Sequence, residues 1–425
     1  MRYGTRCVLV TGLLFLVPGA LSSPAPAGGP GPAESKNVAL IGHLDVEGGG
    51  MVDVQGILAV IGHIDPPYAT TLVDVSDITK PRILSRIKTW PGTHSHKARL
   101  CGNTLIINVE KYRGWKKGDK VGLAFFDVAD PAHPKEITLM EMGGVETEGS
   151  GVHRYQVDCA RKLVYLSGSV DGYLGNISLI VDFSDPKAPK EVGRWWIPGQ
   201  WVAGGERPTW KGNDFRTHHP LRWGDRLYIS LWYGGFAIVD ISDITKPKTV
   251  SSLNYHPPYA WPTHTALRVG HKILGRDWLL VVDEQIAAGC EHRPAFMLVV
   301  DITNERLPVP VANFQVPEGG KYSYCDGQQD KHFGAHQPHE YVGEDNLVYL
   351  TWFAGGLRIV DISNPYQPRE AGYYVPEPVA GFKFPMSNDV FLDKNGVIYL
   401  IDRYNGLDLL RFTGERQTKW KHWGR

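Results

Sequence analysis

The chain has 425 residues, and its 45 Lys and Arg side chains balance its 45 Asp and Glu side chains. Because the formal net charge is zero and no basic stripe is visible, the composition offers no electrostatic support for nucleic-acid binding. The chain is rich in Trp, Tyr, Gly and Pro, a mixture that suits short strands joined by many turns.

Residues 1–22 have the pattern of a secretory signal peptide. Arg2 and Arg6 precede an apolar run over residues 7–17, and small residues follow. This run is too short to span a bilayer comfortably, and no later segment is apolar enough to cross a membrane. Residues 23–36 are rich in Pro, Ala and Gly, so we expect a flexible linker there. The sequence thus predicts an exported protein, either periplasmic or secreted.

A short phrase recurs at roughly 50 to 60 residues, a period typical of repeat architectures. It consists of an apolar run, an aspartate, an apolar residue and a small polar turn, as in Ile238-Val239-Asp240-Ile241-Ser242. The aspartates of the six full copies are Asp74, Asp127, Asp182, Asp240, Asp301 and Asp361. Because they recur at one place in each copy, we interpret them as structural residues that stabilise turns.

Each repeat contains four strand-like segments separated by Gly, Asn and Asp turns. In one repeat, strands are expected to start at His339–Val342 and to continue at 347–352, 357–362 and 371–374. Repeating such a meander around an axis gives a β-propeller. We therefore predict an all-β fold, a seven-bladed β-propeller of four-stranded antiparallel blades over residues 37–414, followed by a C-terminal tail over 415–425. An N-terminal strand over 37–42 completes the seventh blade and closes the ring.

The repeated phrase resembles the LVIVD-repeat family of β-propellers. The resemblance covers nearly all of the chain after the predicted signal peptide. It implies the propeller fold, but it says little about function because one fold hosts many functions.

Four cysteines remain after the predicted leader, and an even number in an exported chain indicates disulfides. Cys101 and Cys159 fall in the first hairpins of adjacent blades, whereas Cys290 and Cys325 fall in loops at the opposite face. The repeat register therefore favours the pairs Cys101–Cys159 and Cys290–Cys325. A thiolate ligand role for Cys325 and free buried thiols both remain open.

Histidines lie at or just before the first strand of five consecutive blades. Since inner strands line the axis of a propeller, these imidazoles are expected to converge at one mouth of the channel, where imidazole is a common metal ligand. The candidate metal ligands are His94, His153, His218, His264 and His336, followed by His96, His219 and His339. Which histidine of each pair faces the axis stays open, and so does a role confined to hydrogen bonding between loops.

Long loops rimmed by aromatic residues are expected on the face with the histidines, and this pattern is typical of a small-molecule site. Glu284 and Asp283 are the preferred candidates for a catalytic base or a further ligand, ahead of Glu146 and Glu148. The piece Thr93-His94-Ser95-His96 is similar to a short phrase of the selenium-binding or methanethiol-oxidase propellers. That resemblance implies copper bound by histidine.

Two functions of different class follow. The first is an exported metalloenzyme, an oxidase or oxygenase of a small molecule that uses copper or iron in preference to zinc. Zinc hydrolysis with Glu284 as the base is a variant of this reading. The second is a non-catalytic binding or scaffold module. Its contact surface would be formed by Trp232, Tyr233, Trp352, Phe353 and Tyr404.

Overall fold

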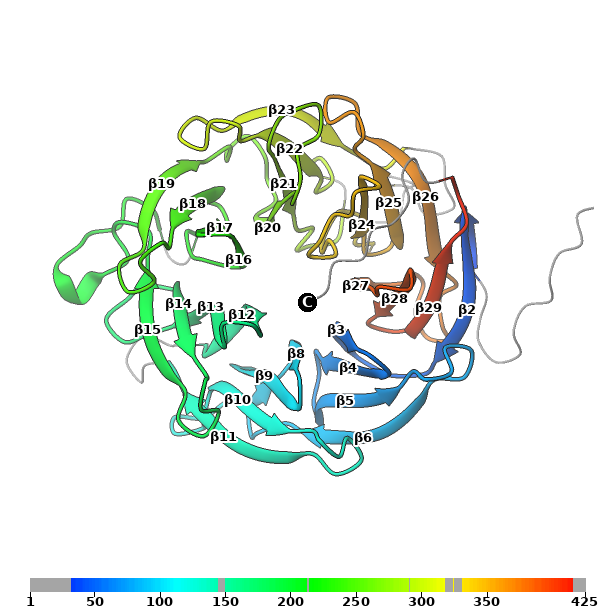
Figure 1. The fold of residues 1–425 in the computed structure, drawn as a ribbon, viewed down its shortest axis with the longest axis horizontal. Coiled ribbons are helices and arrows are strands. Elements are labelled where there is room, and N and C mark those ends of the chain that lie inside the picture. The colour runs from blue at the N-terminus through cyan, green and yellow to red at the C-terminus, as the bar shows by residue number, and fades with distance from the viewer. Residues whose placement is uncertain are drawn as a thin grey trace, which may run out of the picture.

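Short apolar strands pair with their neighbours in sequence to form seven antiparallel sheets, arranged as the blades of a propeller around one axis (Figure 1). The computed structural model describes residues 32–143, 150–211, 214–289, 291–317, 324 and 331–415. Within these residues the only helix is a short 3-10 turn, η1 (Val202–Gly204). The predicted all-β, seven-bladed fold is confirmed.

In each of the first three blades, the strands follow one another from the axis outward. Blade 1 contains β3 (Gly49–Gln55), β4 (Leu58–His63), β5 (Tyr68–Asp74) and β6 (Arg82–Lys88). Blade 2 contains the divided inner strand β7 (Thr93–His94) and β8 (Ala98–Cys101), then β9 (Thr104–Lys111), β10 (Gly122–Asp127) and β11 (Lys135–Glu141). Blade 3 contains β12 (Val152–Asp158), β13 (Leu163–Ser169), β14 (Asn176–Asp182) and β15 (Lys190–Trp195).

The next two blades repeat this order. Blade 4 contains β16 (Pro220–Trp223), β17 (Arg226–Ser230), β18 (Phe236–Asp240) and β19 (Lys248–Leu253). Blade 5 contains β20 (Thr263–Arg268), β21 (Trp278–Asp283), β22 (Met297–Asp301) and β23 (Val309–Phe314).

Blade 6 departs from the pattern at both edges. It contains β24 (Leu347–Thr351), β25 (Leu357–Asp361) and β26 (Arg369–Pro376), and β1 (Pro32–Lys36) pairs outside β26. The strand expected from His339 to Val342 is replaced by a single bridge between Pro338 and Leu350, because proline has no N–H to donate to a ladder. Residues 32–36, which the sequence assigns to the linker, thus belong to a sheet.

The N-terminal strand closes the ring as predicted. Blade 7 contains β27 (Ser387–Leu392), β28 (Val397–Asp402) and β29 (Gly406–Phe412), and its outer strand is β2 (Val38–Leu44). Figure 1 shows β2 and β29 side by side, and their register pairs Val38 with Phe412 and Leu44 with Leu407. Segments far apart in sequence therefore form one sheet, which removes an open edge.

The repeated aspartates form one kind of turn throughout the ring. In each full copy a carboxylate oxygen accepts a hydrogen bond from the backbone N–H two residues further on, at 2.7–2.9 Å. This local bond mimics a backbone turn and directs the chain from the third strand to the fourth. The structural interpretation of these aspartates is confirmed.

The hydrophobic core is divided among the spaces between blades. One cluster joins blades 7 and 1 through Ile61, Val73, Tyr399 and Leu409, and another joins blades 2 and 3. A larger cluster around Trp278 and neighbouring side chains joins blades 4, 5 and 6. The polar side chains of the inner strands are left to face the axis. No helix in the described part of the chain is long and apolar enough to cross a membrane.

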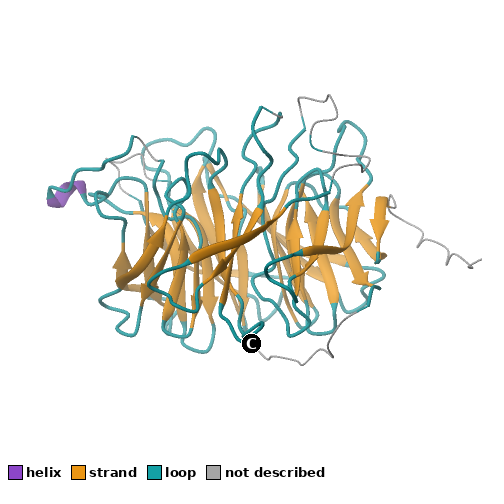
Figure 2. Ribbon diagram, turned by 90° about the horizontal axis from the view of Figure 1, so that it is seen from above, coloured by secondary structure: helices purple, strands orange, loops and turns teal. Residues whose placement is uncertain are grey.

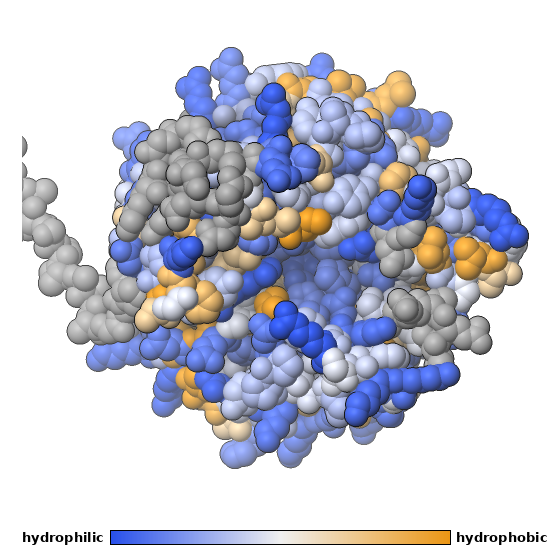
Figure 3. Space-filling model, turned by 180° about the vertical axis from the view of Figure 1, so that it is seen from behind, coloured by the Kyte–Doolittle hydropathy of each residue, from blue (hydrophilic) through white to orange (hydrophobic). Residues whose placement is uncertain are grey.

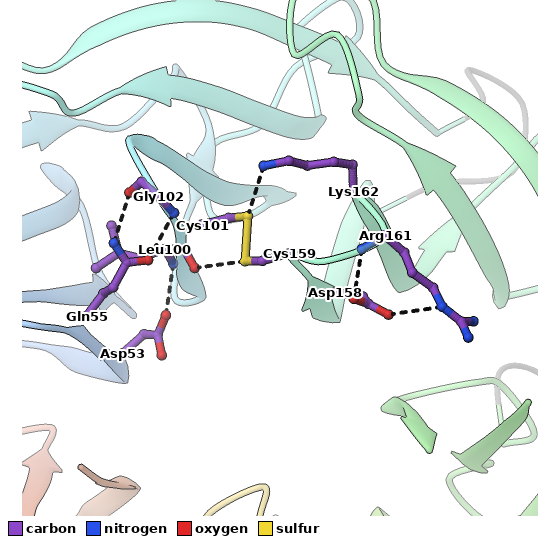
Figure 4. The surroundings of a disulfide bond; sticks show 9 residues. All are labelled: Asp53, Gln55, Leu100, Cys101, Gly102, Asp158, Cys159, Arg161 and Lys162. Carbon is purple, nitrogen blue, oxygen red and sulfur yellow. Dashed lines mark hydrogen bonds and ion pairs between the residues drawn. A yellow bond between two sulfur atoms is a disulfide. The ribbon is translucent and has the colours of Figure 1, made fainter. Parts of the chain in front are cut away.

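A disulfide links blades 2 and 3, as the repeat register predicts. Cys101 ends β8 and Cys159 follows β12, with their Cα atoms 5.5 Å apart (Figure 4). The second predicted pair, Cys290–Cys325, lies outside the described residues, as do the predicted signal peptide and Glu146 and Glu148.

Removal of this disulfide should lower the stability of the fold. The bond closes a loop with a sequence separation of 58 residues, and such crosslinks typically contribute about 2–4 kcal/mol by restricting the unfolded chain. We expect the variant Cys101→Ser/Cys159→Ser to unfold at a lower denaturant concentration by that amount. An unchanged midpoint would contradict a formed crosslink.

Candidate metal centre

Six histidines from five consecutive blades lie in ring-to-ring contact at one mouth of the channel. Their neighbouring ring centres are 4.4 to 5.2 Å apart along the series His94, His96, His153, His218, His264 and His336. We call this series the histidine arc. The longer loops gather on one face of the disc (Figure 2), and Figure 3 shows the hydrophilic hollow at the centre of that face.

Local breaks in the strand register aim two of these side chains. β12 is bulged between Val152 and Arg154, and β20 is bulged between Thr263 and Thr265. His153 and His264 are the extra residues at these bulges. A bulge re-aims a side chain out of the strand alternation, so both imidazoles reach the mouth.

Four members of the arc have a hydrogen-bond partner at Nδ1, and in three of them the partner is a carboxylate or carbonyl oxygen that only accepts. His153 donates to Glu110 Oε1 at 2.8 Å, His218 to the carbonyl of His264 at 2.9 Å, and His336 to the carbonyl of Asn388 at 2.5 Å. His264 Nδ1 lies 2.8 Å from the Thr265 hydroxyl. Partners of this kind fix the tautomer and leave Nε2 available as a metal ligand.

The Nε2 atoms of His153 and His218 are only 2.9 Å apart. Because each ring donates its Nδ1 proton to a carboxylate or carbonyl oxygen, the neutral rings would direct two lone pairs at each other. A proton on His153, next to the Glu110 carboxylate, relieves this conflict. A shared metal ion would relieve it as well, since two ligands at about 2.0–2.1 Å from one ion lie about 3 Å apart. The donor set therefore fits a metal ion.

Glu284 is the carboxylate nearest to the second half of the arc. Its two oxygens lie 3.9 Å from His264 Nε2 and 3.8 Å from His336 Nε2. The ligand atoms of His218, His264 and Glu284 all lie within 4.8 Å of one another. Burial raises the pKa of Glu284 above its usual value, with the Arg403 charge acting in the opposite direction.

Glu110 holds the first half of the arc together. Its oxygens lie 3.1 Å from His94 Nε2 and 3.7 Å from His96 Nδ1, besides the bond from His153. Burial alone would raise the pKa of Glu110, but the neighbouring His153 and His94 lower it to about 2. His94, His96 and Glu110 form a second group that could hold a cation.

Burial keeps four members of the arc neutral. It lowers the pKa values of His96, His218, His264 and His336 well below the usual value, and neighbouring positive charges act in the same direction. Neutral imidazole is the form that binds metals. The environment therefore favours the ligand form at neutral pH.

A charged layer fills the axis beneath the histidines. Glu340 of blade 6 reaches across the channel to Arg99 of blade 2, to Arg154 of blade 3 at 3.1 Å and to His219 of blade 4 at 3.3 Å. These cations lower the pKa of Glu340 well below its usual range, although burial opposes them. The mouth is therefore shaped like a cup. We call the charged layer at its floor, formed by Glu340, Arg99, Arg154 and His219, the axial ion cluster.

The structure separates the remaining predicted ligands from the arc. His219 belongs to the axial ion cluster, and burial lowers its pKa to about 3. His339 lies against the edge of Phe391, with ring centres 5.3 Å apart. In the pairs His218–His219 and His336–His339, only the first histidine belongs to the arc. In the pair His94–His96, both histidines belong to it.

The structure places Asp283 differently from Glu284. Consecutive residues of a strand point to opposite sides, and the Asp283 carboxylate instead accepts a hydrogen bond from the Tyr255 hydroxyl at 2.5 Å. Burial raises the pKa of Asp283 well above its usual value. This residue supports the loop before β20 and does not face the arc.

Sequence reasoning did not single out several site residues. Glu110 carries no motif, although it lies near the end of the second strand of blade 2 as Asp283 does in blade 5. Lys97, Arg403 and Glu340 carry no motif of their own. Their roles depend on contacts between blades that are distant in sequence.

Three of the five aromatic residues considered for a contact surface are buried, whereas Tyr233 and Tyr404 are partly exposed. Trp352 and Phe353 are almost fully enclosed, and Trp232 is 9% exposed. Phe353 stacks on His336 with ring centres 4.5 Å apart, and Trp232 lies 5.1 Å from His218. These rings support the imidazoles and do not form an exposed binding surface.

Comparison with known proteins identifies the repeat. The family model described as LVIVD repeat matches residues 223–254 and 344–375, so the chain carries LVIVD repeats in blades 4 and 6. The chain is a seven-bladed β-propeller that carries LVIVD repeats and has histidine and glutamate clusters at its axial mouth. No curated protein matches it.

Solved structures share the fold at low identity. The periplasmic gluconolactonase PpgL of Pseudomonas aeruginosa is similar with a TM-score of 0.51 and 11% identity, covering 77% of this chain and 85% of that one. A chain from the Saccharomyces cerevisiae complex of Dbp5 with Nup159 and Gle1 is similar with a TM-score of 0.50 and 10% identity, covering 90% and 98%. These similarities concern the fold alone.

The axial ion cluster predicts a large effect for one carboxylate. Replacing Glu340 by Ala leaves Arg99 and Arg154 buried without their shared partner, a change that typically costs about 3–5 kcal/mol. Chemical denaturation should show this loss for Glu340→Ala. The exposed pair of Lys120 and Glu141 provides the control, because Glu141→Gln should change stability by less than about 1 kcal/mol. Equal effects of the two variants would contradict a central role for Glu340.

Acid should destabilise the metal-free protein. The unfolded chain protonates its histidines near pH 6.5, whereas the buried members of the arc have lowered pKa values and stay neutral. The unfolded state therefore binds more protons, and stability falls as pH decreases from about 7, by about 1.4 kcal/mol per pH unit for each such group. Denaturation between pH 7.5 and 5.5 should show this slope. It should be smaller in His218→Gln than in the wild type.

Proposed function

We propose that this protein is an exported metalloenzyme that binds one copper or iron ion through His153, His218, His264 and His336 and oxidises a small molecule at the axial mouth. The observation that carries the proposal is the close approach of the Nε2 atoms of His153 and His218, at 2.9 Å, in rings whose Nδ1 atoms are both committed to oxygen acceptors.

The donor set supports the choice of metal and reaction class. Imidazole ligands suit copper and iron, and a site rich in neutral imidazole fits oxidation better than hydrolysis. A bound redox metal supplies electron transfer and oxygen chemistry that side chains cannot provide. The hydrophilic hollow in Figure 3 gives a small molecule access to this end of the channel.

The residues of the chain orient ligands and handle protons. Glu110 and the carbonyl groups of His264 and Asn388 hold the imidazoles in position. Glu284 lies within 4 Å of two Nε2 atoms, and its raised pKa lets it accept or return a proton closer to neutral pH than an exposed carboxylate does. We assign Glu284 the role of general base.

The disulfide and the predicted signal peptide support export. Disulfides persist mainly in oxidising compartments, and the pair Cys101–Cys159 is placed to form one. The non-catalytic binding module remains the alternative function, but burial of Trp352 and Phe353 deprives it of the expected surface.

Elemental analysis of the tag-free protein tests the metal proposal. We expect about one equivalent of copper or iron in the wild type and less than about a tenth in His153→Ala/His264→Ala, because half of the donor set is removed. The variant His133→Ala/His271→Ala alters histidines outside the arc and should keep the metal. Circular dichroism would check that each variant is folded.

The other outcomes are equally informative. Absence of metal after reconstitution with copper(I), copper(II) and iron(II) would overturn the proposal and favour the binding module. Stoichiometric zinc would keep the metal site but contradict the oxidation chemistry.

A further inference from the structure

The histidine arc does not close on itself. Its members come from blades 2 to 6, and the two remaining blades contribute no imidazole to it among the described residues. His63 of blade 1 is committed elsewhere, because its two nitrogens lie 2.8 Å from the Glu47 carbonyl and the Thr71 hydroxyl. Blade 7 places Asn388 at its bulge, in the position that His153 and His264 occupy in their blades.

Arg403 fills the gap between the two ends of the arc. It follows β28 in blade 7, and its guanidinium lies 5.4 Å from the ring centre of Phe353, which stacks on His336. At the other end, the Arg403 charge acts on the Tyr112 hydroxyl, and Tyr112 stacks on His94 with ring centres 4.4 Å apart. The mouth is therefore bounded by imidazoles on one side and by a guanidinium on the other.

The guanidinium is anchored at one nitrogen and open at the others. Arg403 Nε donates to Asn388 Oδ1 at 2.8 Å, and Asn388 is itself bonded to the Gly50 carbonyl. Among the described residues, the two terminal nitrogens of Arg403 have no hydrogen-bond or ion-pair partner. An arginine held by Nε presents its remaining N–H groups as a fixed fork, which suits a carboxylate.

A second basic side chain lies deeper in the same cup, and burial lowers the pKa of this lysine, Lys97, well below its usual value. Lys97 is 3% exposed, and its amine has no hydrogen-bond or ion-pair partner in the part of the chain that the structure describes. Its charge acts on His96, His336 and Glu284, which places it near the axis between the two ends of the arc. A buried amine without a partner is costly unless a ligand completes its surroundings.

We infer that the sector between His336 and His94 binds the carboxylate of an anionic substrate, with Arg403 as its anchor and Lys97 beneath it. This inference rests on the proposed function, because it places the rest of the substrate against the imidazole side of the mouth. It assigns the substrate class as small carboxylic acids and makes Arg403 a residue that determines specificity.

Binding of carboxylates to the metal-free protein tests this inference separately from the metal proposal. The probes are acetate, propionate and benzoate, each compared with its neutral amide by calorimetry after chelation of metals. We expect at least one acid to bind and its amide not to bind. Arg403→Gln should weaken binding of the acid at least tenfold, Arg403→Lys should weaken it less because the charge is kept, and Arg82→Gln at the exposed rim should leave it unchanged.

Three results would overturn the inference. They are absence of binding by every acid, equal binding of an acid and its amide, and equal affinities of wild type and Arg403→Gln. Binding of inorganic phosphate without binding of any carboxylate would also contradict the substrate class.

Melting temperatures of the variants would show that each is folded, and Arg403→Lys separates loss of charge from loss of the contact with Asn388. Since no metal is present, loss of the metal proposal would not alter these outcomes.

Discussion

Closure of the ring by β2 on β29 is the constraint on which the rest of the structure depends. The pairing of Val38–Leu44 with Gly406–Phe412 joins the two ends of the described chain in one sheet. Seven blades then share one axis, and the beginnings of their inner strands are forced onto a small circle. Polar side chains at those positions are brought within reach of one another across the axis, so Glu340 of blade 6 meets cations from blades 2, 3 and 4.

The same constraint orients the imidazoles. His94 donates to the Ile64 carbonyl of blade 1, His218 to the His264 carbonyl of blade 5, and His336 to the Asn388 carbonyl of blade 7. Each of these rings is thus held by a neighbouring blade and not by its own. Partners of this kind set the direction of the free nitrogen. The geometry of the site is therefore a property of the closed ring, and any loss of closure would release several ligands together.

The sequence predicts the fold well because the repeat is local, whereas the site depends on details that a repeat conceals. The period of the aspartate phrase identifies the blades, and the register places Cys101 next to Cys159. The bulges at His153 and His264 break the alternation of the strand by one residue, so counting positions cannot say which histidine of a pair faces the axis. Glu284 and Asp283 were both predicted from their place at the end of the second strand on the face of the histidines, and only the contacts in the folded chain distinguish them. Arg403 and Glu340 act across the ring, where no local pattern reports them.

The mouth combines two environments that favour different chemistry. Burial keeps His218 and His264 neutral and raises the pKa of Glu284, while Arg403 keeps the facing sector positive. A carboxylate entering this sector would compensate the charge of Arg403, and that charge otherwise opposes the rise in the pKa of Glu284. Binding of the anion would therefore raise the proton affinity of Glu284 further. Recognition of the substrate and readiness of the general base would then be coupled through one guanidinium.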